Sequence, residues 1–499
     1  MKFRGVIANY SGQVWAGLVN ILVVPLYISM VGLEQYGLIG IYILLQAWLP
    51  LLDFGLSQAL TREVAKRRIV SSFSEDLPDL CRTAEAAAIF LSISLGILFW
   101  LASGLLTSQL RVNTSDLDPE LIKHFFQIMG LALGARLYES IHRGVLIGLQ
   151  KHVHLNCFQI LRSTVSGFGA IALMSITSKT AIIFISWQVG VSLISAVVLM
   201  FLAYSMTGVS IAAGKPSWSQ LSSLWSYSSN LALISFLSLV LTQFDKVILI
   251  RLVSLDDFAV YSIAFTLSSS LSLFVAPIAI TFFPLFCEQV GLRRYSELRS
   301  SFHLSAQLVS LTSSSVGITV IAFAYYIILY WTQNQDIASK GAPILILLTV
   351  GMVINSFALI PYHLQLAYGW TRLTVRLNLF LVAIFLPLAM LLTSVIGMLG
   401  AALSFVLLNV FSLLIGSRAM FRKILKSEKL RWIWSDILQP SMVCLTLLIV
   451  IRVLIIHKVD SAIALFMALG LSSFLAFFAS LLVADVVRPA IVKRLDSLM

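Results

Sequence analysis

Several titratable side chains occur close together inside one long hydrophobic segment, residues 123–149. They are Arg136, Glu139, His142 and Arg143. Arg136, Glu139 and Arg143 have the i, i+3, i+7 spacing that puts side chains on one face of a helix. Ionisable groups inside a membrane segment are costly, and they usually face a bundle interior or a wet cavity. This segment is therefore the first candidate for a functional site.

The next hydrophobic segment, residues 152–176, carries Arg162. If the two segments form a hairpin that turns near Lys151, Arg136 and Arg162 lie at depths that differ by roughly 6 Å, given a rise of 1.5 Å per residue. Guanidinium groups present a planar fork of donors that matches the oxygens of phosphate. We therefore predict that Arg136, Arg143 and Arg162 bind an anionic substrate near the middle of the bilayer.

A structural interpretation competes with the binding interpretation. Glu139 could neutralise Arg136 or Arg143, and pairing with Arg143 is as consistent with the spacing as substrate binding. Three arginines face one local acid, so at least one cation is left over in either case. That excess favours an anionic ligand.

Three other intramembrane positions are candidates. Lys246 follows Asp245 in the segment 222–250, and adjacent helix residues point about 100° apart, so the two need not pair. Lys246 either faces substrate or has a structural role. Asp53, in the segment 36–60, is either a carboxylate sensitive to H⁺ or Na⁺ or the acceptor of a structural bond from a neighbouring helix.

The sequence predicts neither a catalytic nor a metal site. His142, His152 and His154 share no ligand spacing with a cysteine or an acidic cluster, and the four cysteines are single. The phosphate-binding pattern GxxxxGK[ST] does not occur. We expect no cofactor, and energy must come from an H⁺ or Na⁺ gradient, the membrane potential or the substrate gradient.

Hydrophobic segments that position these residues fill the chain. It has 499 residues, of which 59% are hydrophobic and 11% charged, with a mean hydropathy of +0.96. A membrane-spanning helix needs about 20 mostly apolar residues. We predict an all-α polytopic membrane protein with about fourteen spans, near 6–30, 36–60, 82–106, 123–149, 152–176, 179–205, 222–250, 257–286, 301–331, 342–366, 370–394, 397–420, 435–456 and 461–484.

Charge patterning gives the orientation. Lysine and arginine crowd every second gap between the segments, most densely in the run from Arg418 to Arg431. Basic residues are retained on the cytoplasmic side, so both termini are predicted to be cytoplasmic. The net charge of +12 has the same origin, and nucleic acid is not an expected partner.

An internal repeat predicts the domain organisation. Tyr36 and Tyr261 each open a second segment after a short acidic gap. Two six-helix bundles, 1–215 and 216–430, would then be related by a pseudo-two-fold axis along the membrane normal, followed by two additional spans in 431–499. Parallel repeats of this kind are typical of transporters that bind substrate between the halves.

Short motifs in the first 430 residues resemble those of the polysaccharide-transport branch of the multidrug/oligosaccharidyl-lipid/polysaccharide exporter superfamily. They are Pro25-Leu26-Tyr27, Gly32-x-x-x-Tyr36-Gly37-Leu38, Asp53-x-Gly55-Leu56, Gly144-x-Leu146-x-Gly148-Leu149-Gln150-Lys151 and Asp245-Lys246-x-Ile248. The resemblance implies a flippase of the bacterial inner membrane, not an enzyme, that moves an isoprenoid-diphosphate-linked oligosaccharide of the O-antigen type. Its implied partners are that substrate, membrane lipids and other polysaccharide assembly proteins.

The resemblance also assigns roles to residues. In this family a cationic cavity between the two bundles opens alternately to each side of the membrane. The matching cations here are Arg136, Arg143, Arg162 and Lys246, and Arg62 at the inner mouth could attract the head group. Asp53, Glu139 and Asp245 are the coupling or structural carboxylates.

Three alternatives remain open at this stage. A peptidoglycan-precursor flippase would bind the same diphosphate anchor. An ion-coupled multidrug antiporter of the same fold would be expected to have acidic or aromatic residues in its cavity. A membrane glycosyltransferase or ligase would need acidic catalytic residues on a sizeable external loop, and the predicted loop 107–122 is short.

Overall fold

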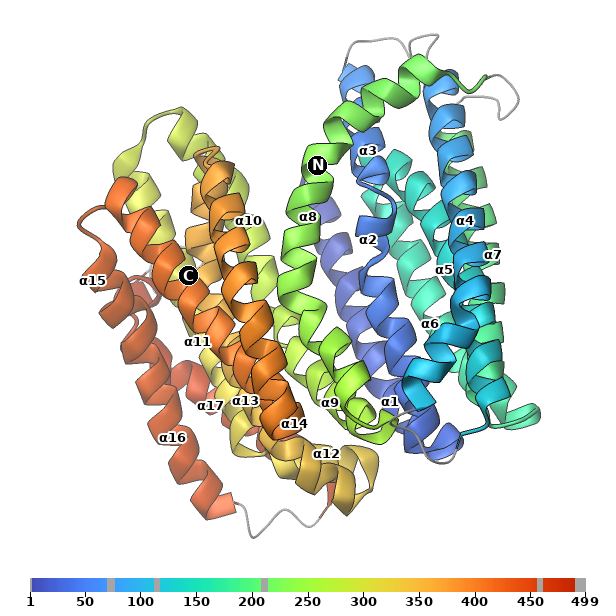
Figure 1. Cartoon of the computed structure of the whole chain (residues 1–499). Helices are drawn as coiled ribbons and strands as arrows, with labels where there is room; N and C mark the ends of the chain where they lie inside the picture. Colours follow the sequence, from blue (N-terminus) through green and yellow to red (C-terminus); the bar gives the residue numbers. More distant parts are fainter. Residues whose placement is uncertain (1, 70–76, 112–116, 208–213, 456–460, 490–499) are drawn as a thin grey trace. The chain divides into compact units, whose positions relative to one another are not determined.

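The computed structural model describes residues 2–69, 77–111, 117–207, 214–455 and 461–489. Every regular element within these ranges is a helix (Figure 1). Ten helices of the described part are long and apolar enough to cross a membrane. The protein is therefore an all-α, multi-spanning membrane protein, as predicted. The fold is compatible with fourteen spans, but that number stays a prediction.

Contacts between α-carbons divide the chain into two compact units, which we call the N-terminal unit (residues 1–259) and the C-terminal unit (residues 260–499). The predicted bundles, 1–215 and 216–430, and the extra pair of spans in 431–499 stay predictions. Each unit is described by itself.

The N-terminal unit is organised around one central helix, α5, which packs against α3, α4 and α7, while α6 packs against α1 and α7. The charged segment predicted from the sequence is thus the middle of the unit. The helices of this unit are α1 (Lys2–Ala47), α2 (Leu49–Leu52), α3 (Leu56–Ile69), α4 (Leu77–Arg111), α5 (Pro119–Gly148), α6 (His152–Ile176), α7 (Ala181–Thr207) and α8 (Trp218–Leu252). Helix α9 (Leu255–Ser269) runs across the boundary between the units.

Two backbone breaks shape the first 60 residues, and both coincide with the family motifs. Helix α1 joins the first predicted span to the second through a kink at Gly32, whose φ of 80° favours glycine. The second predicted span is then interrupted between α2 and α3. There the Asp53 carboxylate accepts hydrogen bonds from the Gly55 N–H (2.8 Å) and the Ser57 hydroxyl. Asp53 therefore fixes the start of α3, which is a structural role.

Glycines let α5 approach α3 closely. A Cβ atom at Gly144 would lie 2.6 Å from the Ser57 carbonyl oxygen, and one at Gly148 would lie 2.7 Å from that of Thr61. The Thr61 hydroxyl donates to the Gly144 carbonyl across this contact (2.9 Å). Small residues spaced by four allow such backbone contacts between membrane helices. The motif around Gly144 and Gly148 is therefore a packing motif.

The C-terminal unit has its own central helix, α11, which contacts α10, α13, α16 and α17. Helix α14 joins two predicted spans through a kink at Ile396 and Gly397. The predicted spans 257–286 and 301–331 are each divided between two helices. The helices are α10 (Ser272–Gly291), α11 (Tyr295–Ala322), α12 (Ala324–Thr332), α13 (Gln335–Ala367), α14 (Thr371–Lys423), α15 (Lys429–Arg431), the π-helix η1 (Trp432–Leu438), α16 (Gln439–Ile455) and α17 (Ala462–Leu481).

The close approach of α5 to α3 gives a test. We expect Gly144→Ala to destabilise the folded protein by about 1–3 kcal/mol, because the new methyl group meets a backbone oxygen that cannot rotate away. Thermal unfolding of the purified protein in detergent measures the effect. Gly190→Ala in α7 is the matched control, since a Cβ there meets nothing within 4 Å. Equal unfolding temperatures for the two variants would contradict the packing role.

Candidate functional site

The buried charges of the N-terminal unit converge on Glu139. Its Oε2 atom lies 3.3 Å from Arg162 Nε of α6 and 3.7 Å from Arg136 Nη1 of α5. The exposed fractions of the three side chains are 5% for Glu139, 9% for Arg162 and 17% for Arg136. The structure therefore brings Arg136 and Arg162 together, as the hairpin argument predicted.

Arg143 has a different partner from the one considered in the sequence analysis. Its Nη2 atom donates to Oε1 of Gln159, one turn before Arg162 on α6, at 3.4 Å. Glu139 thus pairs with Arg136 and Arg162 rather than with Arg143. A neutral amide leaves the positive charge of Arg143 in place.

Two further helices close around the same residues. Tyr42 of α1 interacts electrostatically with Arg136 and Arg162, and Ser192 of α7 lies beside Tyr42. Both are buried. We call Arg136, Glu139, Arg143, Arg162, Gln159, Tyr42 and Ser192 the arginine cluster.

The ion pairs of the arginine cluster are not closed by short hydrogen bonds. Glu139 Oε2, Arg162 Nε and Arg136 Nη1 are buried and contact one another at 3.3 and 3.7 Å, without the geometry of a hydrogen bond. Buried polar groups in proteins are nearly always hydrogen-bonded. The pairing within the cluster is thus electrostatic, and one carboxylate oxygen serves two guanidinium groups.

The charge of the arginine cluster is positive. It holds three guanidinium groups and one carboxylate, within an apolar helix bundle. An ion taken out of water must be compensated by an opposite charge and good hydrogen bonds, or the protein loses several kcal/mol. An anion with several oxygens would supply both, and a phosphate or diphosphate has that chemistry.

The other predicted site residues lie on different helices and have partners of their own. Lys246 is buried on α8, where its Nζ lies 3.5 Å from Asp245 Oδ1 and 3.4 Å from the Thr242 carbonyl oxygen. Asp245 and Lys246 thus do pair, although they are adjacent. Arg62 of α3 is about half exposed and lies 3.5 Å from Glu63. Asp53 caps α3, as described above.

Sequence reasoning missed a second polar cluster, between α4, α5 and α7. Glu85 of α4 accepts a hydrogen bond from Arg82 (3.0 Å), and its second oxygen lies 3.6 Å from His142 Nε2. Glu85, His142 and Tyr204 of α7 border a cavity of about 10 Å³, which is the size of one water molecule. Glu85 lies inside the predicted third span, so the rule that identified Arg136 could also have identified it.

Metal binding finds no support in the part of the chain that the structure describes. No group of three or more histidine, cysteine or acidic side chains there could hold a metal ion. The arginine cluster can bind and orient an anion, but it offers no activated nucleophile and no acid–base pair placed at a reacting bond.

Fold and site together define a multi-spanning membrane transporter rather than an enzyme. The chain belongs to the polysaccharide biosynthesis protein family, whose model matches residues 3–290, more than half of the sequence. The MatE model also matches, over residues 231–391. The protein is thus a member of the polysaccharide-transport branch of the exporter superfamily that the motifs indicated.

A relative and two solved structures agree with this assignment. A protein of Shigella flexneri named "Putative O-antigen transporter" is 21% identical over 375 residues, which cover 75% of this chain and 86% of that protein. The inward closed form of the lipid II flippase MurJ is similar with a TM-score of 0.72 and 13% identity, covering 98% of this chain and 100% of MurJ. An inward-facing multidrug resistance transporter of the MATE family gives a TM-score of 0.67 and 16% identity, covering 83% and 96%. At these identities the two structures show the fold alone.

The charge arrangement predicts unequal effects of neutralising an acid and a base. Glu139→Gln leaves two buried guanidiniums without their carboxylate, so we expect a loss of about 3–5 kcal/mol in folding free energy. Arg143→Gln removes a cation whose hydrogen bond goes to the neutral Gln159, so we expect a change below about 1 kcal/mol. Thermal unfolding of both variants in detergent tests the difference, and a larger loss for Arg143→Gln would contradict the proposed pairing.

Proposed function

We propose that this protein is a flippase that translocates an isoprenoid-diphosphate-linked oligosaccharide, an O-antigen-type repeat unit, across the bacterial inner membrane. The observation that carries the proposal is the arginine cluster, a buried site with three guanidinium groups and one carboxylate in a polysaccharide-transport protein. Both termini are cytoplasmic in this proposal, because the basic gaps include those at the two ends.

The arginine cluster suits a diphosphate for a physical reason. Glu139 holds Arg136 and Arg162 side by side, so their donor forks are oriented before the ligand arrives. Arg143 is held by the neutral Gln159 and contributes its full charge. A diphosphate carries negative charge and many acceptor oxygens, so it can use donors that Glu139 leaves free.

The remaining parts of the proposal come from the family. Substrate binds in a cavity that opens alternately to each side, and Lys246 and Arg62 contribute charge along its path. The isoprenoid tail stays in contact with membrane lipid. We expect no cofactor, and the energy comes from an H⁺ or Na⁺ gradient, the membrane potential or the substrate gradient. Other polysaccharide assembly proteins supply the substrate and take it up.

A peptidoglycan-precursor flippase is the second candidate, because its lipid substrate has the same diphosphate anchor. A multidrug antiporter is less well supported. The three arginines of the cluster would repel a cationic drug. The single carboxylate of the cluster, Glu139, already pairs with two of these arginines.

The proposal is tested by flipping in liposomes. Purified protein is reconstituted with a diphosphate-linked oligosaccharide, and accessibility of the sugar from outside is followed with time. We expect Arg136→Ala and Arg162→Ala each to abolish flipping, and the corresponding lysine variants to restore only part of it, because lysine keeps the charge but loses the fork. Arg452→Ala, at an exposed arginine of α16, is the control and should flip normally.

The outcomes separate the candidates. Normal flipping by folded Arg136→Ala and Arg162→Ala would show that the arginine cluster is not the anion site. If wild-type protein flips peptidoglycan precursor but not the oligosaccharide, the second candidate holds. Flipping of neither lipid by folded protein would overturn the flippase proposal.

A further inference from the structure

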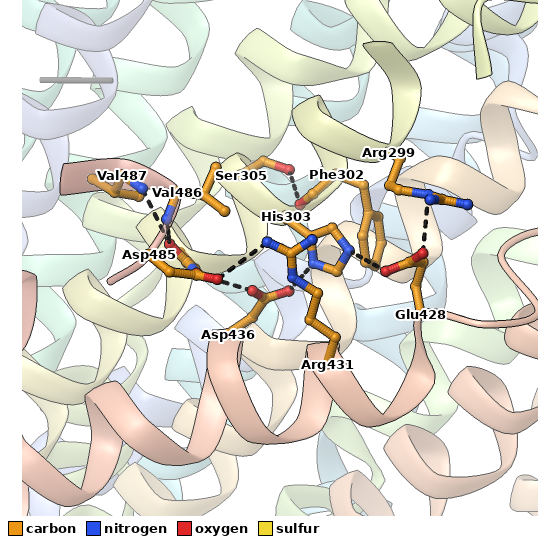
Figure 2. A network of polar contacts seen from close by, with 11 residues as sticks. Arg299, Phe302, His303, Ser305, Glu428, Arg431, Asp436, Asp485, Val486 and Val487 are labelled. Carbon is orange, nitrogen blue, oxygen red and sulfur yellow. Dashed lines mark hydrogen bonds and ion pairs between the residues drawn. The ribbon is translucent and has the colours of Figure 1, made fainter. Parts of the chain in front are cut away.

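The C-terminal unit contains a buried polar network centred on His303 of α11 (Figure 2). The Nδ1 atom of His303 lies 2.5 Å from Asp436 Oδ2, and its Nε2 atom lies 3.0 Å from Glu428 Oε2. Relative to solvent, 1% of His303, 0% of Asp436 and 7% of Glu428 is exposed. Both ring nitrogens therefore face a carboxylate oxygen, out of contact with water.

Gln307, one turn further along α11, extends the network to the end of the last span. Its Nε2 donates to Asp436 and Asp485, while its Oε1 accepts from the backbone N–H groups of Val486 and Val487, both at 3.1 Å. The network thus connects α11 with η1 and with the segment that follows α17 (Figure 2).

Two arginines complete the network at its edges. Arg299 of α11 lies 2.9 Å from Glu428, and Arg431 of α15 lies 3.1 Å from Asp485. With three carboxylates and two guanidiniums, the network is one positive charge short of neutrality unless the ring of His303 is charged.

The surroundings of His303 exclude water and hold its partners in place. Phe302 packs edge-on against Phe421, which in turn packs against Trp432 at the start of η1. These residues belong to the buried apolar core of the unit. Asp436 lies in η1, and single π-helical turns of this kind occur frequently at functional sites.

Proton counting follows from the geometry. A neutral imidazole has one N–H, so it can donate to only one carboxylate, and its other nitrogen would direct a lone pair at the second carboxylate. Only the doubly protonated ring donates to both. We infer that His303 is a proton-binding site: it holds one proton between Asp436 and Glu428, and this proton fastens the last two spans, α16 and α17, to α11.

Docking of α16 and α17 onto α11 then depends on pH. The pKa of Glu428 lies below its ordinary value: burial raises it, but the hydrogen bond from His303 and the charge of Arg299 outweigh burial. The pKa of Asp485 is likewise lowered, because Gln307, Ser435 and Arg431 outweigh burial. These two carboxylates stabilise docking at neutral pH and lose that contribution as the pH falls.

The proton is detected directly by nitrogen-15 NMR of the full-length protein labelled at histidine. The chain has seven histidines. At about pH 8.5 an ordinary histidine is neutral. We expect the nitrogen-15 signals of one ring to show that it is doubly protonated at this pH. These signals should be absent from the spectrum of His303→Gln. Seven singly protonated rings in the wild type would overturn the inference without any variant.

Asp436→Asn provides a matched variant that should fold. Its amide nitrogen can donate to His303 Nδ1 while its oxygen still accepts from Gln307, so the network is satisfied with a neutral ring. We compare the unfolding equilibrium constants of the two proteins as the pH is raised above neutrality. The constant of the wild type should rise faster than that of Asp436→Asn, by up to about tenfold per pH unit. This factor is the effect of one proton that the folded wild type binds and the unfolded chain releases. Identical pH dependence of the two proteins would overturn the role of the proton in docking.

Discussion

The cost of placing charge inside a helix bundle governs this structure. A carboxylate or guanidinium within the bilayer must find a counter-charge or a hydrogen-bonding partner, and the helices are arranged accordingly. In the N-terminal unit Arg162 reaches across to Glu139 of α5 from α6, which itself packs against α1 and α7. In the C-terminal unit the requirement brings η1 and the chain after α17 against α11, through Asp436 and Asp485.

The two units meet this requirement to different degrees. Around His303 every carboxylate has a cationic or amide partner, and a protonated ring makes the network electrically neutral. Around Glu139 the positive charges outnumber the negative ones. A balanced network rigidifies its surroundings, whereas an unbalanced one attracts a ligand of opposite charge. The N-terminal unit thus keeps an excess of positive charge at its buried cluster, whereas the buried network of the C-terminal unit joins α11 to η1 and to the chain after α17.

Backbone geometry provides the frame for the charges. Gly144 and Gly148 let α5 lie against α3, and Asp53 fixes where α3 begins. These residues belong to the motifs that indicated the family, yet in the part of the chain that the structure describes Asp53 and Gly144 hydrogen-bond to Gly55 and to hydroxyl groups of α3, outside the arginine cluster. Such motifs reflect how the helices pack.

The sequence by itself determined the class of protein, because membrane helices reveal themselves through length, hydropathy and the side on which lysine and arginine collect. It also determined that Arg136 and Arg162 meet, since the two lie at similar depths on either side of a tight turn. It could not determine that Glu139 pairs with Arg162 rather than Arg143, because the choice depends on how α6 is rotated against α5. Nor could it reveal His303 as a proton site. Its carboxylate partners lie more than 120 residues away along the chain, and only tertiary packing and the π-helical turn bring them to the two ring nitrogens.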